Sequence, residues 1–241
     1  IVTSETYLQD SRHRKELLDL DPDNRLLARG ARFRLSSAVI RDAALSVSGL
    51  LNPDVGGQPV YPYQPDRLWK EFSLERFGYT TSQGKDLYRR SLYTFWRRTV
   101  APPNMFDSSN RQVCSVKPSR TNTPIQALIL LNDPTYVESA CFLASDVLTK
   151  NLTDVEPRTL LIDAFSRVLA RQPKESELAN LVQAYSDSLE YFGSRAEEAA
   201  KYVTSGQSYD LPKYENEIVR LAALTSVVQV LLNTDEFMTR E

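Results

Sequence analysis

Histidine, cysteine and methionine are scarce in this chain of 241 residues, which has one histidine, two cysteines and two methionines. Covalent attachment of a c-type haem needs the pattern Cys-x-x-Cys-His, and Cys114 and Cys141 lie too far apart to form it. A structural zinc site takes about four cysteine or histidine ligands, one more than the chain contains. A Ser-His-Asp triad would have to use His13, which lies in the basic run 11–15. We therefore assign no catalytic, cofactor-binding or metal-ligating residue to this chain and expect a non-catalytic role.

An excess of charge of one sign is also absent, because 29 basic side chains face 31 acidic ones. A net charge of −2 provides no general attraction for nucleic acid or an anionic membrane, so we expect no nucleic-acid partner. The longest apolar stretch, 221–232, is interrupted by Thr225, Ser226 and Gln229 and is too short to span a bilayer. The chain begins at Ile1 without an initiator methionine or a signal sequence, and we expect it to be part of a longer protein.

Apolar residues at helical spacing recur along most of the chain. Thr123-Pro124 followed by Gln126 is a capping signature, and Asn132-Asp133-Pro134 predicts a second cap that starts a new helix directly after the first. A polar connection is expected over 193–212. Helical segments are expected at 1–20, 24–29, 37–51, 124–131, 134–148, 157–170, 176–192, 214–232 and 236–238.

The middle of the chain departs from this pattern. Prolines and glycines between 52 and 65 predict an ordered but irregular excursion. The aromatic-rich segment 87–99 is the best strand candidate, with a helix as the alternative. The sequence thus predicts a mainly α, irregular helical domain with at most a small strand element around residues 87–99. We expect one domain over 1–241, within which 1–120 would form an irregular helix-and-loop half and 121–241 a helical-bundle half.

Arginines alternate with aromatic residues in the middle segment, and this is the candidate binding surface. Our first interpretation is structural, with the arginines paired to acids of this chain and the aromatic side chains packed. An anionic glycan or the carboxylates of a partner protein are the alternatives, because an arginine fork binds such groups bidentately. A single-stranded nucleic acid is a weaker alternative, given the net charge. The candidate surface consists of Arg89, Arg90, Tyr93, Trp96, Arg97, Arg98 and Arg120.

Several separated runs of residues resemble one protein family. The runs are 24–30 (NRLLARG), 87–96 (LYRRSLYTFW), 120–128 (RTNTPIQAL), 132–134 (NDP) and 231–237 (LLNTDEF). They are similar to the planctomycete-specific C-terminal domain, a family of unknown function found in large exported proteins, usually with a cytochrome-c-type domain upstream. The likeness extends along the whole chain.

The resemblance implies export to the periplasm or the extracellular space. It supplies no catalytic residues, and any c-type haem would belong to a partner or an upstream segment. We therefore expect a non-catalytic scaffold or interaction module of a larger exported, cytochrome-associated protein or complex, whose partners are other segments or subunits of it. The alternative is the binding or processing of an anionic polysaccharide through the arginine and aromatic surface. In an oxidising compartment Cys114 and Cys141 would pair more readily, but an apolar helical face around Cys141 favours free thiols.

Overall fold

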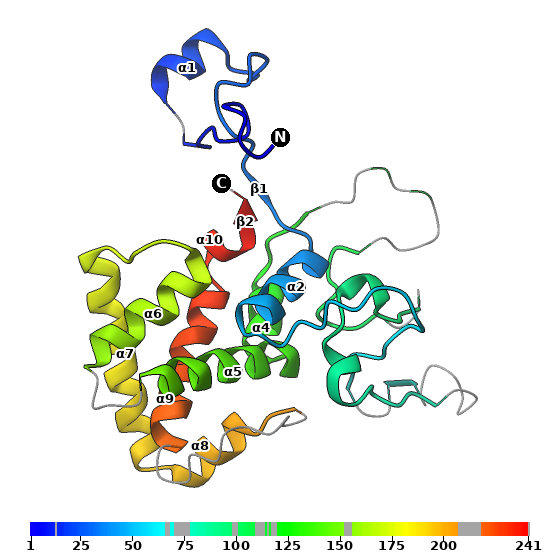
Figure 1. Cartoon of the computed structure of the whole chain (residues 1–241), viewed down its shortest axis with the longest axis vertical. Coiled ribbons are helices and arrows are strands. Elements are labelled where there is room, and N and C mark those ends of the chain that lie inside the picture. Colours follow the sequence, from blue (N-terminus) through cyan, green and yellow to red (C-terminus); the bar gives the residue numbers. More distant parts are fainter. Residues whose placement is uncertain are drawn as a thin grey trace.

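The computed structural model is mainly helical, as the sequence predicts, and has a bundle of helices, a looped half and a small N-terminal lobe (Figure 1). None of the helices in the described part is long and apolar enough to cross a membrane. The structure describes residues 1–12, 14–65, 68–69, 78–97, 101–108, 114, 116, 120–151, 156–206 and 218–240.

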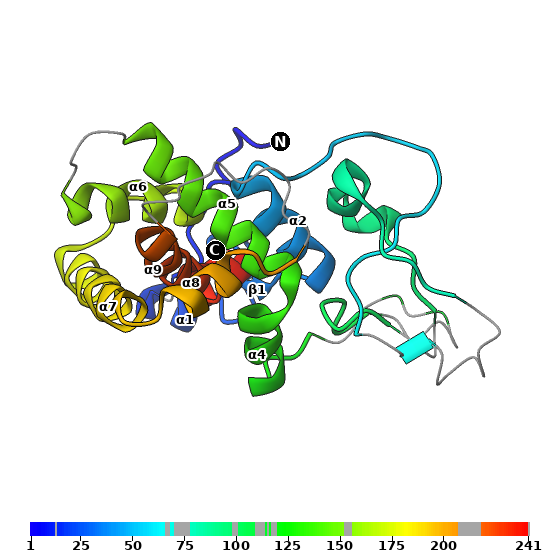
Figure 2. The same ribbon diagram turned by 90° about the horizontal axis from the view of Figure 1, so that it is seen from below.

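The core of the bundle forms around the last long helix, α9 (Ile218–Leu232). This helix is apolar on all sides, and ten of its fifteen residues are buried, as is typical of a helix that neighbours enclose. It packs mainly against α5, α7 and α8, while α2 packs on α5 from the other side (Figures 1 and 2). The surrounding helices are α2 (Ser37–Val47), α5 (Pro134–Lys150), α6 (Pro157–Leu169), α7 (Glu175–Gly193) and α8 (Ala196–Val203).

The sharp corner between α4 (Pro124–Asn132) and α5 confirms the two predicted caps. The Thr123 hydroxyl accepts a hydrogen bond from the Gln126 backbone N–H at 3.4 Å, and the Gln126 side chain accepts one from the Thr123 N–H. The Asp133 carboxylate accepts a hydrogen bond from the Thr135 N–H at 2.9 Å. Two locally encoded caps therefore set the corner.

The segment predicted as a strand contains two short 3-10 helices, η1 (Gly84–Tyr88) and η2 (Ser91–Tyr93). In place of a strand ladder, its described residues form two isolated parallel bridges to the preceding loop, Asn52 with Arg89 and Val60 with Thr94. The physical reason is Arg41, a fully buried arginine on α2. Its guanidinium donates hydrogen bonds to the backbone carbonyls of Leu87 and Arg89 at 2.9 Å each. Those carbonyls are therefore not available to a strand partner.

A small antiparallel sheet forms instead from two segments far apart in the sequence. β1 (Phe33–Arg34) pairs with β2 (Thr239–Arg240), with Phe33 opposite Arg240. β2 follows α10 (Asp235–Met238), the short terminal helix that the sequence predicts. The pairing brings the C-terminal end of the chain to the base of the N-terminal lobe (Figure 1).

The N-terminal helix is shorter than expected, because only Lys15–Leu20 (α1) is helical. The expected helix at 24–29 is wrong. The Asp21 carboxylate accepts the N–H groups of Arg25 and Leu26 at 2.8 and 2.7 Å, and Asn24 and Leu27 have positive φ angles of 52° and 57°. The polar connection expected over 193–212 is also only partly correct, because the helix α8 (Ala196–Val203) lies within it.

Both cysteines are free thiols. Cys114 is exposed, whereas Cys141 is buried on α5 with its Sγ 3.5 Å from the carbonyl oxygen of Val203. Burial raises the pKa of the Cys141 thiol to about 12.

Candidate functional site

The candidate arginine and aromatic surface is held in place by Arg41 and its neighbour Asp42. Besides the two carbonyls, the Arg41 guanidinium donates to Ser91 Oγ at 3.2 Å and lies 3.6 Å from Asp42. Asp42 Oδ1 in turn accepts hydrogen bonds from the Ser91 N–H and hydroxyl at 2.8 and 2.7 Å. Burial lowers the pKa of Arg41, and the Asp42 carboxylate opposes that shift. An arginine nevertheless stays protonated in a protein, so a permanent charge anchors this segment to α2.

Arg89 is turned inward and is not part of an open surface. It is 5% exposed, and its guanidinium donates to the backbone carbonyls of Asp54 at 3.2 Å and Gln58 at 3.1 Å and also to that of Gly56. The Tyr93 ring lies 4.0 Å below the same guanidinium, within the range of a cation–π contact. Arg89 therefore holds the loop 54–58 in place and has a structural role, with backbone carbonyls as its partners and not the acidic side chains expected from the sequence.

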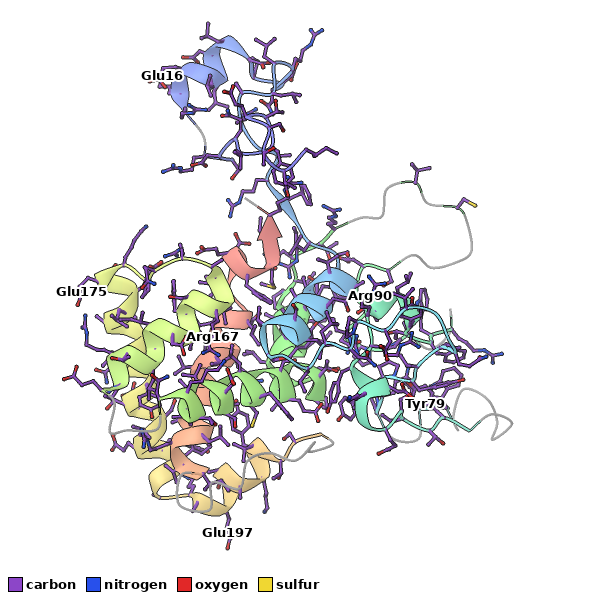
Figure 3. All side chains as sticks on the ribbon, viewed as in Figure 1. Glu16, Tyr79, Arg90, Arg167, Glu175 and Glu197 are labelled. Atoms are coloured by element: carbon purple, nitrogen blue, oxygen red, sulfur yellow. The ribbon has the colours of Figure 1, made fainter. Side chains whose placement is uncertain are left out.

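Tyr93 links the loop to the rest of the surface. Its phenol oxygen accepts the Gly56 N–H at 2.9 Å, and the Arg90 guanidinium lies 6.0 Å from its ring. The Gly56 N–H and the two arginines stabilise the phenolate, so the pKa of Tyr93 lies below its usual value. Arg90 lies on the looped half next to α2 (Figure 3).

A shallow pocket of about 330 Å³ adjoins Tyr93. Trp96 and Phe95 line it from one side and Gly57 and Pro59 from the other. Arg97, next in the chain, is exposed. Of the candidate surface, Tyr93 and Trp96 line this pocket, and the Arg90 guanidinium lies 6.0 Å from the Tyr93 ring.

The remaining predicted residues lie elsewhere. The Arg120 guanidinium is 4.6 Å from the ring of Phe33 on β1, at the base of the N-terminal lobe, and Arg240 approaches the same ring at 5.8 Å. Arg98 and His13 fall outside the residues that the structure describes. The fold thus divides the predicted surface into an inward arginine, a small aromatic pocket and a separate arginine.

Two other large aromatic residues of the looped half, Trp69 and Tyr88, are inside the protein. Trp69 is 6% exposed and stacks on Tyr79 at 5.4 Å between ring centroids. Tyr88 is 3% exposed and donates to Glu138 Oε1 at 3.2 Å. Both side chains therefore stabilise the looped half and do not contribute to a binding surface.

A pocket beside α4 was not anticipated from the sequence. It has a volume of about 480 Å³ and lies between α4, the segment 63–65 and Pro103. Its apolar walls include Ile125, Leu128 and Ile129, and the capping carboxylate Asp133 also lines it. The sequence contained a signal for this pocket, because α4 (PIQALILLN) has apolar residues around most of its circumference and one face of it can be left uncovered. In the structure Ile125 and Leu128 are 69% and 58% exposed.

A cluster of buried polar groups surrounds Asp133. Asp133 is 8% exposed, and its Oδ1 accepts hydrogen bonds from the Thr135 N–H at 2.9 Å and from Asn104 Nδ2 at 3.3 Å. Burial raises the pKa of the Asp133 carboxyl, while these hydrogen bonds and the Arg41 cation oppose the shift. The fully buried Tyr136 lies close enough to Asp133, Arg41 and Asp42 for their charges to shift the pKa of its hydroxyl. None of the described residues forms a group of three or more histidine, cysteine or carboxylate side chains that could hold a metal ion.

The sequence model of a family described as PSD1, a protein of unknown function (DUF1553), matches residues 1–185. A search of curated proteins and a search of solved structures each found no match.

Proposed function

Because this chain belongs to the PSD1 family of proteins of unknown function, we propose that it acts through contacts with other protein segments. In this proposal it is a non-catalytic interaction module of a larger exported protein, in the periplasm or outside the cell, and docks against a cytochrome-c-type segment of that protein or complex. The haem belongs to the partner, and this chain supplies a contact surface.

The observation that carries this proposal is the exposure of apolar side chains on the N-terminal lobe, residues 1–32. α1 buries none of its residues, and the only buried residue among those described in the lobe is Ser11. The lobe projects from the rest of the molecule, with Glu16 at its outer part (Figures 1 and 3). Its exposed large apolar residues are Ile1 (100%), Val2 (63%), Tyr7 (45%), Leu8 (68%), Leu18 (37%), Leu20 (81%), Leu26 (82%) and Leu27 (55%).

Polar contacts, not an apolar core, hold this lobe in shape. The Asn24 side chain donates to the Arg29 carbonyl at 2.9 Å and accepts from its N–H at 3.2 Å, and Arg14 donates to the Ala28 carbonyl at 2.9 Å. Leu27 is held at a positive φ of 57°, which costs a non-glycine residue about 1–2 kcal/mol. These contacts order a turn whose leucines point to solvent.

Large exposed apolar patches mark sites of interaction with proteins or membranes, and eight large apolar side chains are exposed on this lobe. Each leucine that a partner covers contributes about 1.5–3 kcal/mol from the hydrophobic effect. With a net charge of only −2, the chain has little long-range electrostatic attraction to offer, so we expect the docking to depend on apolar contact and weakly on salt.

The test is binding of this chain to the cytochrome-c-type segment of its parent protein, measured by isothermal titration calorimetry. We expect micromolar or tighter association, and we expect the double variant Leu20→Glu/Leu26→Glu to weaken it at least about tenfold. Val230→Glu is the matched control, because Val230 is an exposed apolar residue (53%) on α9. The docking proposal is wrong if the wild-type chain shows no association, or if the control weakens binding as much as the lobe variant.

A second candidate is the binding of an anionic polysaccharide at the aromatic pocket. It is favoured by the position of Tyr93 and Trp96 in one pocket with Arg90 beside them, which suits a sugar ring that carries an acidic group. Heparin and alginate are suitable probes, and their affinity should fall as salt is raised. Trp96→Ala should remove the binding, whereas Arg120→Ala, on a separate part of the molecule, should leave it unchanged. Equal loss in both variants would count against this pocket.

A further inference from the structure

The 480 Å³ pocket beside α4 combines apolar walls with a single buried carboxylate. Its volume lies within the range of small-ligand sites, which are mostly apolar and carry a few polar groups that orient the ligand. The apolar walls are formed by Tyr63, Pro65, Pro103, Ile125, Leu128 and Ile129.

Most polar groups that line this pocket are occupied by neighbours. The Asn132 side chain donates to the Leu128 carbonyl at 2.7 Å, and the Tyr63 hydroxyl donates to Glu138 at 2.9 Å. Gln64 accepts a hydrogen bond from the Trp69 indole N–H through its Oε1, whereas its Nε2 is buried and has no hydrogen-bond partner among the described residues. Asn132 and Tyr63 therefore contribute mainly to the shape of the pocket.

Asp133 differs from these groups. It is more than nine-tenths buried, and its Oδ1 accepts hydrogen bonds from the Thr135 N–H and from Asn104. The Thr135 side chain adds a further hydrogen bond that favours the charged carboxylate. A carboxylate in a largely apolar surrounding needs further donors or a cation to offset the loss of water.

The charges around Asp133 do not cancel. Among the described residues, the cluster has one cation, Arg41, and two carboxylates, Asp42 and Asp133, all close to Tyr136. Its net charge is therefore −1, and Arg41 directs its nitrogens to Leu87, Arg89 and Ser91. The C-terminus of α4 and the N-terminus of α5 meet at Asp133, and their partial charges are of opposite sign and similar size. The two helix ends thus leave the excess negative charge in place.

We propose that this pocket binds an alkylammonium group, with its ammonium head at the Asp133 carboxylate and its hydrocarbon body along the walls formed by α4 and the prolines. The charge of the head complements the cluster, and a chain of several methylene groups fits the apolar walls. The inference concerns a site separate from the N-terminal lobe and does not depend on the docking proposed for it.

The test uses n-hexylammonium chloride as the probe and n-hexanol as its uncharged counterpart, with chemical-shift changes of backbone amides as the measurement. We expect hexylammonium to perturb residues of α4 and the 63–65 segment at millimolar concentration, and hexanol to bind at least about tenfold more weakly, because a charge-assisted hydrogen bond is lost.

The decisive variant is Asp133→Asn, which removes the charge but keeps the cap, since asparagine caps helices as well as aspartate. It should weaken hexylammonium binding about tenfold and leave hexanol binding unchanged. Glu175→Gln, on an exposed carboxylate at the start of α7, is the matched control and should change neither. Equal binding of the two probes to the wild type, or unchanged hexylammonium affinity in a folded Asp133→Asn protein, would overturn the proposal.

Discussion

Replacement of Arg41 by methionine should be among the most destabilising single changes in this protein. The side chain is 1% exposed and donates to two backbone carbonyls at 2.9 Å and to Ser91 Oγ at 3.2 Å. Methionine fills much of the same volume but leaves the carbonyls of Leu87 and Arg89 without a donor, at a cost of about 1–3 kcal/mol each. Asp42 also loses the cation 3.6 Å away but keeps its two hydrogen bonds from Ser91. We expect a total loss of about 3–5 kcal/mol.

The assay is urea denaturation followed by far-UV circular dichroism, with the free energy of unfolding extrapolated to water. Arg158→Met is the matched control, because Arg158 pairs with Glu175 on the exposed surface at 2.9 Å, and such a pair contributes about 0–1 kcal/mol. Arg41→Lys should recover little, since an ammonium group cannot reproduce the planar fork that reaches two carbonyls. If Arg41→Met does not fold, Ser91→Ala gives a milder test and should cost about 1 kcal/mol. A loss of less than about 1 kcal/mol in Arg41→Met, similar to the control, would refute this account of the segment.

Four further predictions concern a helix cap, the two cysteines and a titrating carboxylate. Thr123→Ala removes the cap of α4 and should lower the free energy of unfolding by about 1 kcal/mol, measured by urea denaturation beside Thr149→Ala, a non-capping threonine on α5. Iodoacetamide at pH 8 should modify the exposed Cys114 in the native protein and Cys141 only after unfolding, as mass spectrometry of tryptic peptides would show. The pKa of the Cys141 thiol rises from 9.0 to about 12 on folding, so the thiol of the unfolded state loses its proton at lower pH than that of the folded state. The free energy of unfolding of the wild type should therefore fall as the pH rises from about 9 to about 12, and it should fall less steeply in Cys141→Ala, which has no thiol. Glu177 has its pKa lowered from 4.5 to about 2 by Arg171 and the Lys174 N–H, so its contribution should be present above pH 4.5 and disappear towards pH 2. Equal acid sensitivity of Glu177→Gln and the wild type would contradict that role.

The helices with capping signals of their own were predictable from the sequence. Thr123, Gln126 and Asp133 set the ends of α4 and α5 through contacts within three residues, which do not depend on the rest of the fold. The expected strand around 87–99 failed because its carbonyls bind Arg41, which lies 46 residues before Leu87 in the chain. Aromatic content favoured a strand, but a single buried guanidinium determined the local backbone.

The candidate surface was predictable in part. Arg90, Tyr93 and Trp96 are three residues apart in the sequence; Tyr93 and Trp96 line one pocket, and Arg90 lies next to the Tyr93 ring. Composition cannot tell whether a guanidinium points to solvent or to its own backbone, and Arg89 does the latter. The pocket proposed to bind an alkylammonium group could not be anticipated, because the sequence indicated only a helix cap at Asp133. The opposite wall of the pocket is formed by Pro103 and the 63–65 segment, which are remote from Asp133 in the sequence.

The sequence by itself determined that the chain is mainly helical, where α4, α5, α6 and α7 begin and end to within two residues, and which family it resembles. Periodicity and capping are local properties, and in α4 and α5 the tertiary structure leaves them in place. Tertiary structure alone decided that Arg89 faces inward, that the leucines of the N-terminal lobe stay exposed, and that Asp133 lines an apolar pocket. These features depend on how distant segments pack, and burial and electrostatic environment exist only once that packing is in place.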